Sequence, residues 1–251
     1  MRIIAIFVSL LLTCTCGLTN AAVLNACGGD NNWPPMSYVT NQTQFVKGIS
    51  AEILRNIFPN KINIKLLPWA RCLYQAQSQL DVDIVMSVFR TPDREQTFLF
   101  SKPYMSLTPS YLYSKKRFSS PPLKILSDLN NYKICALHGA STLYTNLPPQ
   151  KIDSGATNYT SLLKKIDRSY CDIVVDMREV FAGFSALELL QIDERQYQIL
   201  RIPETNKYAL QFAVSKTHPQ AEEIIDRLNQ GLNQLIKSGG LNNLIEREGI
   251  Q

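Results

Sequence analysis

The feature that most constrains the fold of this chain is a regular alternation of short apolar runs with amphipathic segments. Residues 23–27 and 84–88 are apolar runs typical of buried strands, and residues 62–66 alternate apolar and polar side chains as a half-buried strand does. Residues 50–58 and 69–80, which lie between these runs, carry apolar side chains at helical spacing. The resulting β-α-β-α-β order predicts a parallel sheet with right-handed crossovers.

A second set of elements of the same kind begins near Lys116, and the residues 119–122 that follow it read as a linker. Strands are predicted over residues 133–137, 173–176, 197–201 and 208–215, and helices over 161–168, 179–190, 220–237 and 241–248, with a helix start at 141–144. Two consecutive α/β units predict two lobes with a cleft between them. Because open parallel sheets bind ligands beyond the carboxyl ends of their strands, the residues that follow each strand are the candidate ligand contacts.

Residues 1–22 have the pattern of a secretory signal peptide. One basic residue precedes an apolar run over residues 3–12, and small residues precede a predicted cleavage after Ala21 or Ala22. The apolar run is shorter than the stretch of about 20 residues that spans a bilayer. The sequence therefore predicts export to the periplasm; an uncleaved N-terminal anchor and a lipid-modified cysteine in this segment are the alternatives.

Composition excludes several classes of function. With 45% hydrophobic and 19% charged residues, the chain is typical of globular proteins, and a net charge of +5 is too mild to favour nucleic acid as a partner. Four cysteines follow the signal segment, an even number that indicates disulfides in an oxidising compartment. Because the sequence has no CxxC motif and no Cys/His cluster, we expect no metal site and no other cofactor.

Side chains suited to a small charged ligand follow the predicted strands. Arg94 can hold a carboxylate through two parallel hydrogen bonds, and Asp176 can pair with an ammonium group. Gly139, followed by small residues at a helix start, would direct backbone N–H groups at an anion. Trp33 and Trp69 offer aromatic faces to a ligand or a cation. Plainer interpretations exist: the tryptophans as core residues, Arg94 as a surface residue of a turn, and Asp176 as a helix cap.

The segment 87–104, which reads SVFRTPDREQTFLFSKPY, resembles the TxxR…FSxPY signature of the family 3 extracellular solute-binding proteins. These proteins are the substrate-binding subunits of polar amino-acid ABC importers. Weaker matches follow in order at residues 30–35, 48–54, 139–142 and 171–176, and in the closing Gly-Gly-Leu…Leu-Ile. The resemblance therefore covers nearly all of the chain after the signal segment.

This resemblance implies an α/β architecture, the two-lobed type II periplasmic-binding-protein fold, in which each lobe is a mainly parallel sheet flanked by helices. Lobe 1 is expected to be discontinuous, formed by residues 23–113 and 209–251, and lobe 2, residues 114–208, is expected to be inserted between its two parts. Two hinge strands, at residues 110–113 and 208–212, are expected to join the lobes. A monomer is the default state of the family.

The resemblance also implies roles for individual residues. In amino-acid-binding members the signature arginine, here Arg94, holds the ligand α-carboxylate with help from hydroxyl groups, here those of Ser87 and Ser141. An aspartate of the other lobe, here Asp176, holds the α-ammonium group, and an aromatic residue, here Trp33, stacks on the ligand. Further candidate contacts are Asp30, Trp69, Phe89 and His138. Phe89 replaces a usual second hydroxyl and His138 a common glutamine, so the side-chain pocket departs from the family pattern.

The cysteines predict one disulfide and leave a second one open. Cys27 ends the first predicted strand, and Cys72 begins the helix after the second strand. Those two points lie close together in a doubly wound sheet, so we predict a Cys27–Cys72 bond. Cys135 and Cys171 fall at strands that we expect to be neighbours, where a bond can form but is not required.

The function that follows is periplasmic binding of a small polar solute, an amino acid or a related zwitterion, by hinge closure. Delivery to the membrane subunits of an ABC importer would follow, and no catalytic residue is expected. One alternative is a periplasmic dehydratase of the same fold, with Glu179 as its acid or base. A carboxylate in a first helical turn, however, also simply favours the helix dipole. The other alternative is a ligand-sensing module that acts through a membrane receptor.

Overall fold

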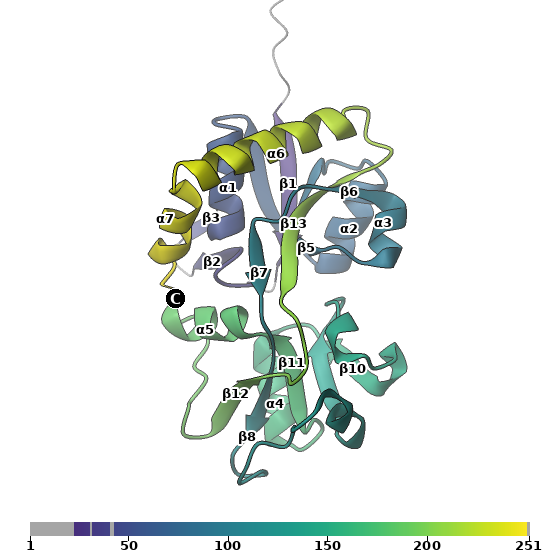
Figure 1. The fold of residues 1–251 in the computed structure, drawn as a ribbon, viewed down its shortest axis with the longest axis vertical. Helices are drawn as coiled ribbons and strands as arrows, with labels where there is room; N and C mark the ends of the chain where they lie inside the picture. The colour runs from purple at the N-terminus through teal and green to yellow at the C-terminus, as the bar shows by residue number, and fades with distance from the viewer. Residues whose placement is uncertain (1–22, 31, 41–42, 250–251) are drawn as a thin grey trace, which may run out of the picture.

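The computed structural model describes residues 23–30, 32–40 and 43–249, so the predicted signal segment lies outside the described residues. Two α/β bodies are stacked along the longest axis of the molecule, and extended segments of the chain connect them (Figure 1). Within the described residues, no helix combines the length and the apolar character needed to cross a membrane. The predicted two-lobed α/β organisation is confirmed.

The first lobe is built on a six-stranded sheet of order β4-β1-β5-β13-β6, in which β7 also pairs with β13. Its strands are β1 (Leu24–Gly29), β4 (Ile62–Leu67), β5 (Ile84–Phe89), β6 (Phe98–Phe100), β7 (Met105–Leu107) and β13 (Tyr208–Ser215). β1 runs parallel to β4 and β5, whereas β13 runs antiparallel to β5, β6 and β7. The helices of this lobe are α1 (Ile49–Ile57), α2 (Trp69–Gln77), α3 (Pro92–Thr97), α6 (Ala221–Lys237) and α7 (Gly240–Arg247).

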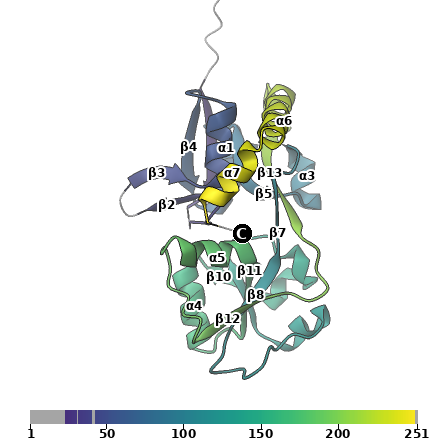
Figure 2. The ribbon, with the colours of Figure 1, turned by 60° about the vertical axis from the view of Figure 1, so that its left-hand side comes forward.

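The second lobe is built on a five-stranded sheet of order β10-β9-β11-β8-β12. Its strands are β8 (Pro109–Ser114), β9 (Ile134–Leu137), β10 (Ile152–Ala156), β11 (Ile173–Met177) and β12 (Tyr197–Arg201), with helices α4 (Tyr159–Asp167) and α5 (Arg178–Ala186). β9 is parallel to β10 and β11, whereas β8 is antiparallel to β11 and β12. Figure 2 shows α5 at the upper edge of this lobe, facing the first lobe.

The chain crosses between the sheets twice. It leaves the first sheet at Thr108, between β7 and β8, and returns over residues 202–207, between β12 and β13. Every residue of β8 is buried, and its ladder is formed with β11 and β12. The expected hinge segment 110–113 therefore lies inside the second sheet, and the first crossing comes earlier than the boundary expected after residue 113. Membership of a sheet depends on non-local pairing, which an apolar run does not specify.

The sheets are mixed, and several short elements were not predicted. The β-α-β units form parallel ladders as expected, but the connecting strands β8 and β13 pair antiparallel. The helix expected to start at residue 141 is only a 3₁₀ turn, Leu143–Thr145. The hairpin of β2 (Tyr38–Thr40) and β3 (Thr43–Lys47) and the strand β10 had no predicted counterpart. β2 has only three residues, and β10, with the sequence IDSGA, has too few apolar residues to read as a strand.

Each lobe contains one disulfide. The predicted Cys27–Cys72 bond is confirmed, with 5.8 Å between the Cα atoms, and it ties β1 to the first turn of α2. The Cys135–Cys171 bond, which the sequence allowed but did not require, is also formed, with 5.9 Å between the Cα atoms. All four cysteines are fully buried. The bonds therefore lie within the lobes and leave the segments that connect the lobes unconstrained.

A cavity between the lobes as the candidate functional site

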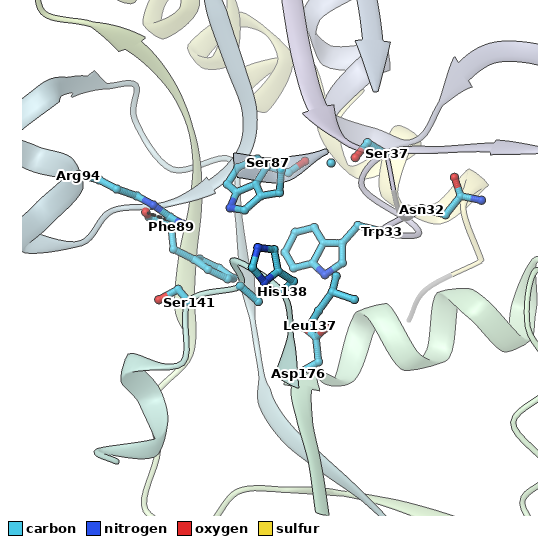
Figure 3. Close-up of a pocket in the computed structure, with 13 residues that line it drawn as sticks. Asn32, Trp33, Ser37, Ser87, Phe89, Arg94, Leu137, His138, Ser141 and Asp176 are labelled. Carbon is cyan, nitrogen blue, oxygen red and sulfur yellow. Dashed lines mark hydrogen bonds between the residues drawn. The ribbon is translucent and has the colours of Figure 1, made fainter. Parts of the chain in front are cut away.

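A cavity of about 70 Å³ lies between the two sheets and is lined from both lobes. The carboxyl ends of β1, β5, β9 and β11 point toward it, as the rule for parallel strands predicts. The first lobe contributes Gly29, Asn32, Trp33, Ser37, Trp69, Ser87, Phe89 and Arg94, and the second contributes Leu137, His138, Ala140, Ser141 and Asp176. Figure 3 shows this set, in which aromatic rings occupy the middle and charged groups the periphery.

Of the side chains expected to contact the ligand, all but that of Asp30 line this cavity, and Gly139, the expected anion contact through its backbone, is not a lining residue. Asp30 is exposed and lies outside the lining, because its backbone N–H continues the β1 ladder to the Leu67 carbonyl at 2.8 Å and the side chain faces solvent. The sequence did not single out Ser37, the residue that ends the turn begun by Trp33. The only sequence feature that could have indicated Ser37 is its position four residues after Trp33, a candidate ligand contact.

Arg94 is positioned by the start of α3. The Thr91 side chain caps this helix by accepting from the Arg94 N–H at 3.3 Å, and Pro92 occupies the first helical position. The guanidinium donates from Nη1 to the Phe89 carbonyl at 3.0 Å and lies 5.5 Å from the centre of the Trp69 ring. Burial lowers the pKa of Arg94 to about 10, so the group is still charged at neutral pH.

Ser87 carries a strained backbone at the edge of the cavity. Its φ of 55° lies in the left-handed region, which non-glycine residues rarely adopt. The Ser87 hydroxyl is 2.9 Å from that of Ser50, which is in turn 2.6 Å from the Tyr104 hydroxyl. This chain of hydroxyl groups fixes the Ser87 side chain at the cavity wall.

Asp176 supplies the negative charge of the opposite wall. Its carboxylate accepts from the Tyr159 hydroxyl and, at 2.7 Å, from the backbone N–H of Met177, and the Trp33 side chain adds a third hydrogen bond. Burial nevertheless raises the pKa of Asp176 to about 6, and hydrogen bonds from Tyr159, Met177 and Trp33 limit the rise. The group is therefore ionised at neutral pH and titrates under mildly acidic conditions.

Neither Arg94 nor Asp176 has an ionic partner among the residues that the structure describes. A buried charge without a counter-ion is costly, and it is stabilised when a ligand brings the opposite charge. The cavity thus presents one unpaired cation and one unpaired anion, each from a different lobe.

The lobes touch each other beside the cavity. Gly183 of α5 lies so close to the Pro34–Pro35 peptide of the first lobe that a Cβ atom at this position would be 2.7 Å from the Pro34 carbonyl carbon. Gly139, at a φ of 73°, lies against the Trp69 ring, which a Cβ atom would approach to 3.0 Å. Small residues of the second lobe therefore allow the aromatic and proline residues of the first lobe to close over the cavity.

Glu179, considered as an acid or base, and His138, a candidate ligand contact, both form hydrogen bonds within the protein. Glu179 accepts from the backbone N–H and the hydroxyl of Thr108, at 2.8 and 2.9 Å, and is not a lining residue. It therefore ties α5 to the segment where the chain crosses between the lobes. The Nδ1 atom of His138 lies 3.1 Å from the Ser154 carbonyl oxygen and donates to it, so this ring nitrogen is bonded within the second lobe.

Comparisons with proteins of known structure agree with this architecture. An amino acid ABC transporter substrate-binding protein from Streptococcus pneumoniae, bound to L-arginine, matches with a TM-score of 0.71 at 19% identity, over 90% of this chain and 93% of that one. A reconstructed ancestral amino-acid-binding protein, a precursor of cyclohexadienyl dehydratase, matches with a TM-score of 0.70 at 21% identity, over 90% and 95%. A histidine kinase sensor domain matches with a TM-score of 0.72 at 16% identity, over 90% and 96%.

At such identities these likenesses establish the fold alone. No curated protein sequence matches the chain. The family model of the bacterial extracellular solute-binding proteins, family 3, matches residues 26–248, which is nearly all of the described chain. The predicted resemblance is thereby confirmed, and the chain belongs to the family 3 extracellular solute-binding proteins of bacteria.

Proposed function

We propose that this protein binds an amino acid, or a closely related zwitterion, in the cavity between its lobes. The observation that carries the proposal is a pair of charges on opposite walls of one cavity, the half-buried Arg94 and the buried Asp176, neither of which forms a salt bridge with another described residue. A zwitterion neutralises both charges at once, whereas a singly charged solute would leave one of them buried and uncompensated. The solved amino-acid-binding structures of the same fold support this class of ligand.

The α-carboxylate is assigned to Arg94, whose guanidinium has five N–H donors and uses one on a backbone carbonyl. The Ser141 hydroxyl oxygen is buried and has no hydrogen-bond partner among the described residues, so it is a second donor for this carboxylate from the other lobe. The α-ammonium group is assigned to Asp176, whose carboxylate has about four acceptor positions and receives three hydrogen bonds from the protein.

Ligand binding would bring the two lobes together by bending the segments that connect them. Because Arg94 and Asp176 belong to different lobes, a zwitterion gains both ion pairs only when the lobes are together, and this differential affinity shifts the population toward the closed form. The crossing segments at Thr108 and at residues 202–207 are the places where the chain can bend. We infer delivery from the periplasm to the membrane subunits of an ABC importer, by a monomer, from the family and the signal segment.

The dehydratase alternative has no support from Glu179, the acid or base it requires, because both carboxylate oxygens bind Thr108 away from the cavity. A sensory role would use the same binding event with a receptor as its partner. Incubation with a prephenate-like substrate tests the first alternative, since any turnover would contradict the proposed function. Co-purification with importer subunits rather than with a receptor tests the second.

The direct test is thermal unfolding of the mature protein with matched sets of ligands. Each set contains an L-amino acid, its amide, which lacks the carboxylate, and its deamino acid, which lacks the ammonium group. We expect the best amino acid to stabilise the protein by about 2.7 kcal/mol at a hundredfold excess over its dissociation constant. Neither analogue should do so. Equal stabilisation by the deamino acid would contradict the assignment of Asp176 to the ammonium group.

A further inference from the structure

We propose that the ligand has a small, uncharged side chain with a hydroxyl or amide group, and that the hydroxyl of Ser37 recognises this group. The inference rests on the proposed function, since it concerns the part of an amino acid that Arg94 and Asp176 leave free. It names a specificity residue, Ser37, that lies outside the set expected from the resemblance.

The charges of the cavity exclude a charged side chain. Among the described lining residues, Arg94 is the only cation and Asp176 the only carboxylate, and a zwitterion uses both. A cationic side chain would be buried in the cavity without a carboxylate of its own, and an anionic one would lack a second cation. His138, the other titratable lining residue, lies with Nδ1 3.1 Å from the Ser154 carbonyl oxygen and supplies no carboxylate to a cationic side chain. Burying an unpaired charge is unfavourable, so the side chain must be neutral.

Ser37 is the polar group of the cavity that most needs a partner. Its side chain is 1% exposed, and its hydroxyl has no hydrogen-bond partner in the part of the chain that the structure describes. A buried hydroxyl without a partner costs free energy, which a ligand recovers by supplying a hydrogen bond. Asn32, its polar neighbour, is already satisfied, because its side-chain amide exchanges hydrogen bonds of 2.9 and 3.0 Å with the backbone of Val39.

The local backbone fixes Ser37 at the cavity wall. The Trp33 N–H donates to the Ser37 carbonyl at 2.7 Å, and the Ser37 N–H donates back to the Trp33 carbonyl at 3.1 Å. The Pro34–Pro35 peptide completes this turn and packs on Gly183 of the second lobe. Trp33 and Ser37 are therefore held as one unit, which places an aromatic ring and an unpartnered hydroxyl on the same cavity.

Figure 3 separates the two ends of the site: Arg94 and Ser141 lie on one side of the view and Ser37 on the other, with Trp33 and His138 between them. The second unpartnered hydroxyl, that of Ser141, is thus on the carboxylate side, and Ser37 is left for the side chain. The cavity, of about 70 Å³, must also hold the α-carboxylate and α-ammonium groups, so it suits a small side chain rather than a large aromatic one.

The test compares isosteric pairs of amino acids that differ by a polar group: threonine with valine, and asparagine with leucine. Isothermal titration of the wild-type protein should show a preference of roughly 10- to 100-fold for the polar member of at least one pair. In Ser37→Ala this preference should fall to within about threefold while thermal unfolding stays cooperative. A preference that survives in Ser37→Ala, or tighter binding of a charged or purely apolar amino acid to the wild type, would overturn the proposal.

Ser141→Ala is the matched control, because it removes the other unpartnered hydroxyl. We expect it to weaken both members of a pair by the same factor and to leave their ratio unchanged. A ratio that collapses in Ser141→Ala and persists in Ser37→Ala would also overturn the assignment. If no amino acid binds the wild-type protein, the proposed function itself fails, and that result is distinct from binding without selectivity.

Discussion

The two charged walls of the cavity are stabilised in different ways. Arg94 stands at the start of a six-residue helix, and within the described residues its guanidinium donates to one acceptor, the Phe89 carbonyl. Asp176 lies in a buried strand and accepts from Tyr159, Met177 and Trp33. Arg94 therefore keeps most of its donors for a ligand, whereas Asp176 has most of its acceptors in use. We infer that Arg94 contributes more of the affinity and that Asp176 sets its dependence on pH.

The largest effect should come from removing the arginine. Arg94→Ala should lower the affinity for the amino acid by about 2–5 kcal/mol, because the ligand carboxylate would be buried without a partner. Asp176→Asn should cost less, since the amide still accepts hydrogen bonds. Isothermal titration measures both losses. Arg90→Ala is the control, because Arg90 is an exposed residue of the same loop that pairs with Glu95, and its removal should change nothing.

If Arg94→Ala lost less affinity than Asp176→Asn, Asp176 rather than Arg94 would contribute more of the binding energy. Near-native affinity in Arg94→Ala would remove the carboxylate assignment altogether.

The next effect is a dependence of stability on pH. The pKa of Asp176 is raised to about 6 in the folded protein, so the folded state binds the proton more tightly than the unfolded chain does. This contributes about 3 kcal/mol of stability that is fully present below the ordinary carboxyl pKa and is lost as pH rises through 6. Urea unfolding of the ligand-free protein should therefore show a gain in stability from pH 7 to pH 5.

Over the same interval the affinity for the amino acid should fall, because a protonated Asp176 no longer attracts an ammonium group. Burial also raises the pKa of Glu248, so its titration adds to the change in stability. Asp176→Asn separates the two groups. If its stability changed with pH as steeply as that of the wild type, Asp176 would not be the group responsible.

Tyr159→Phe should change stability and the pH dependence of binding by a smaller amount, and only through Asp176. Losing the hydroxyl that donates to the carboxylate should cost about 1.5–3 kcal/mol of stability at neutral pH, since hydrogen bonds to charged groups have this magnitude. It should also raise the pKa of Asp176 and move the pH midpoint of binding upward. Tyr197→Phe removes a similar bond to Asp167 in the same lobe and should leave that midpoint in place. An unchanged midpoint in both variants would contradict the role of Tyr159.

The smallest effect should come from the cap that positions Arg94. Thr91→Ala should cost about 1 kcal/mol, which is typical for an N-cap, and should weaken binding several-fold without altering its pH dependence. Asn158→Ala is the control, because Asn158 caps α4 through a 2.8 Å bond from the Ser161 N–H, away from the cavity. Equal losses of affinity in both variants, measured by titration, would show that capping acts only through global stability.

Periodicity was a sound guide to the long elements and a poor one to the short ones. The strand at residues 84–88 and the helix at residues 220–237 carry enough apolar positions to show their period, and both occur as β5 and α6. β10 and the β2–β3 hairpin are too short or too polar for that. The residues of the candidate site were predicted to different degrees. Arg94 and Asp176 could be predicted because each is charged and lies at or after the end of a strand, whereas nothing in the sequence distinguishes Ser37 from the other serines.

By itself the sequence determined the two-lobed α/β class, the Cys27–Cys72 bond and the two charges that face the cleft, because these depend on local patterns and on the ends of strands. Only the tertiary structure decided that β8 belongs to the second sheet, that Glu179 serves the crossing segment, and that Ser37 is buried without a partner. Strand pairing, desolvation and unsatisfied hydrogen bonds are properties of residues brought together from distant parts of the chain. A linear pattern identifies such a meeting only where strand ends bring two marked residues together, as it does for Cys27 and Cys72, and it does not mark Ser37 or Glu179 in this way.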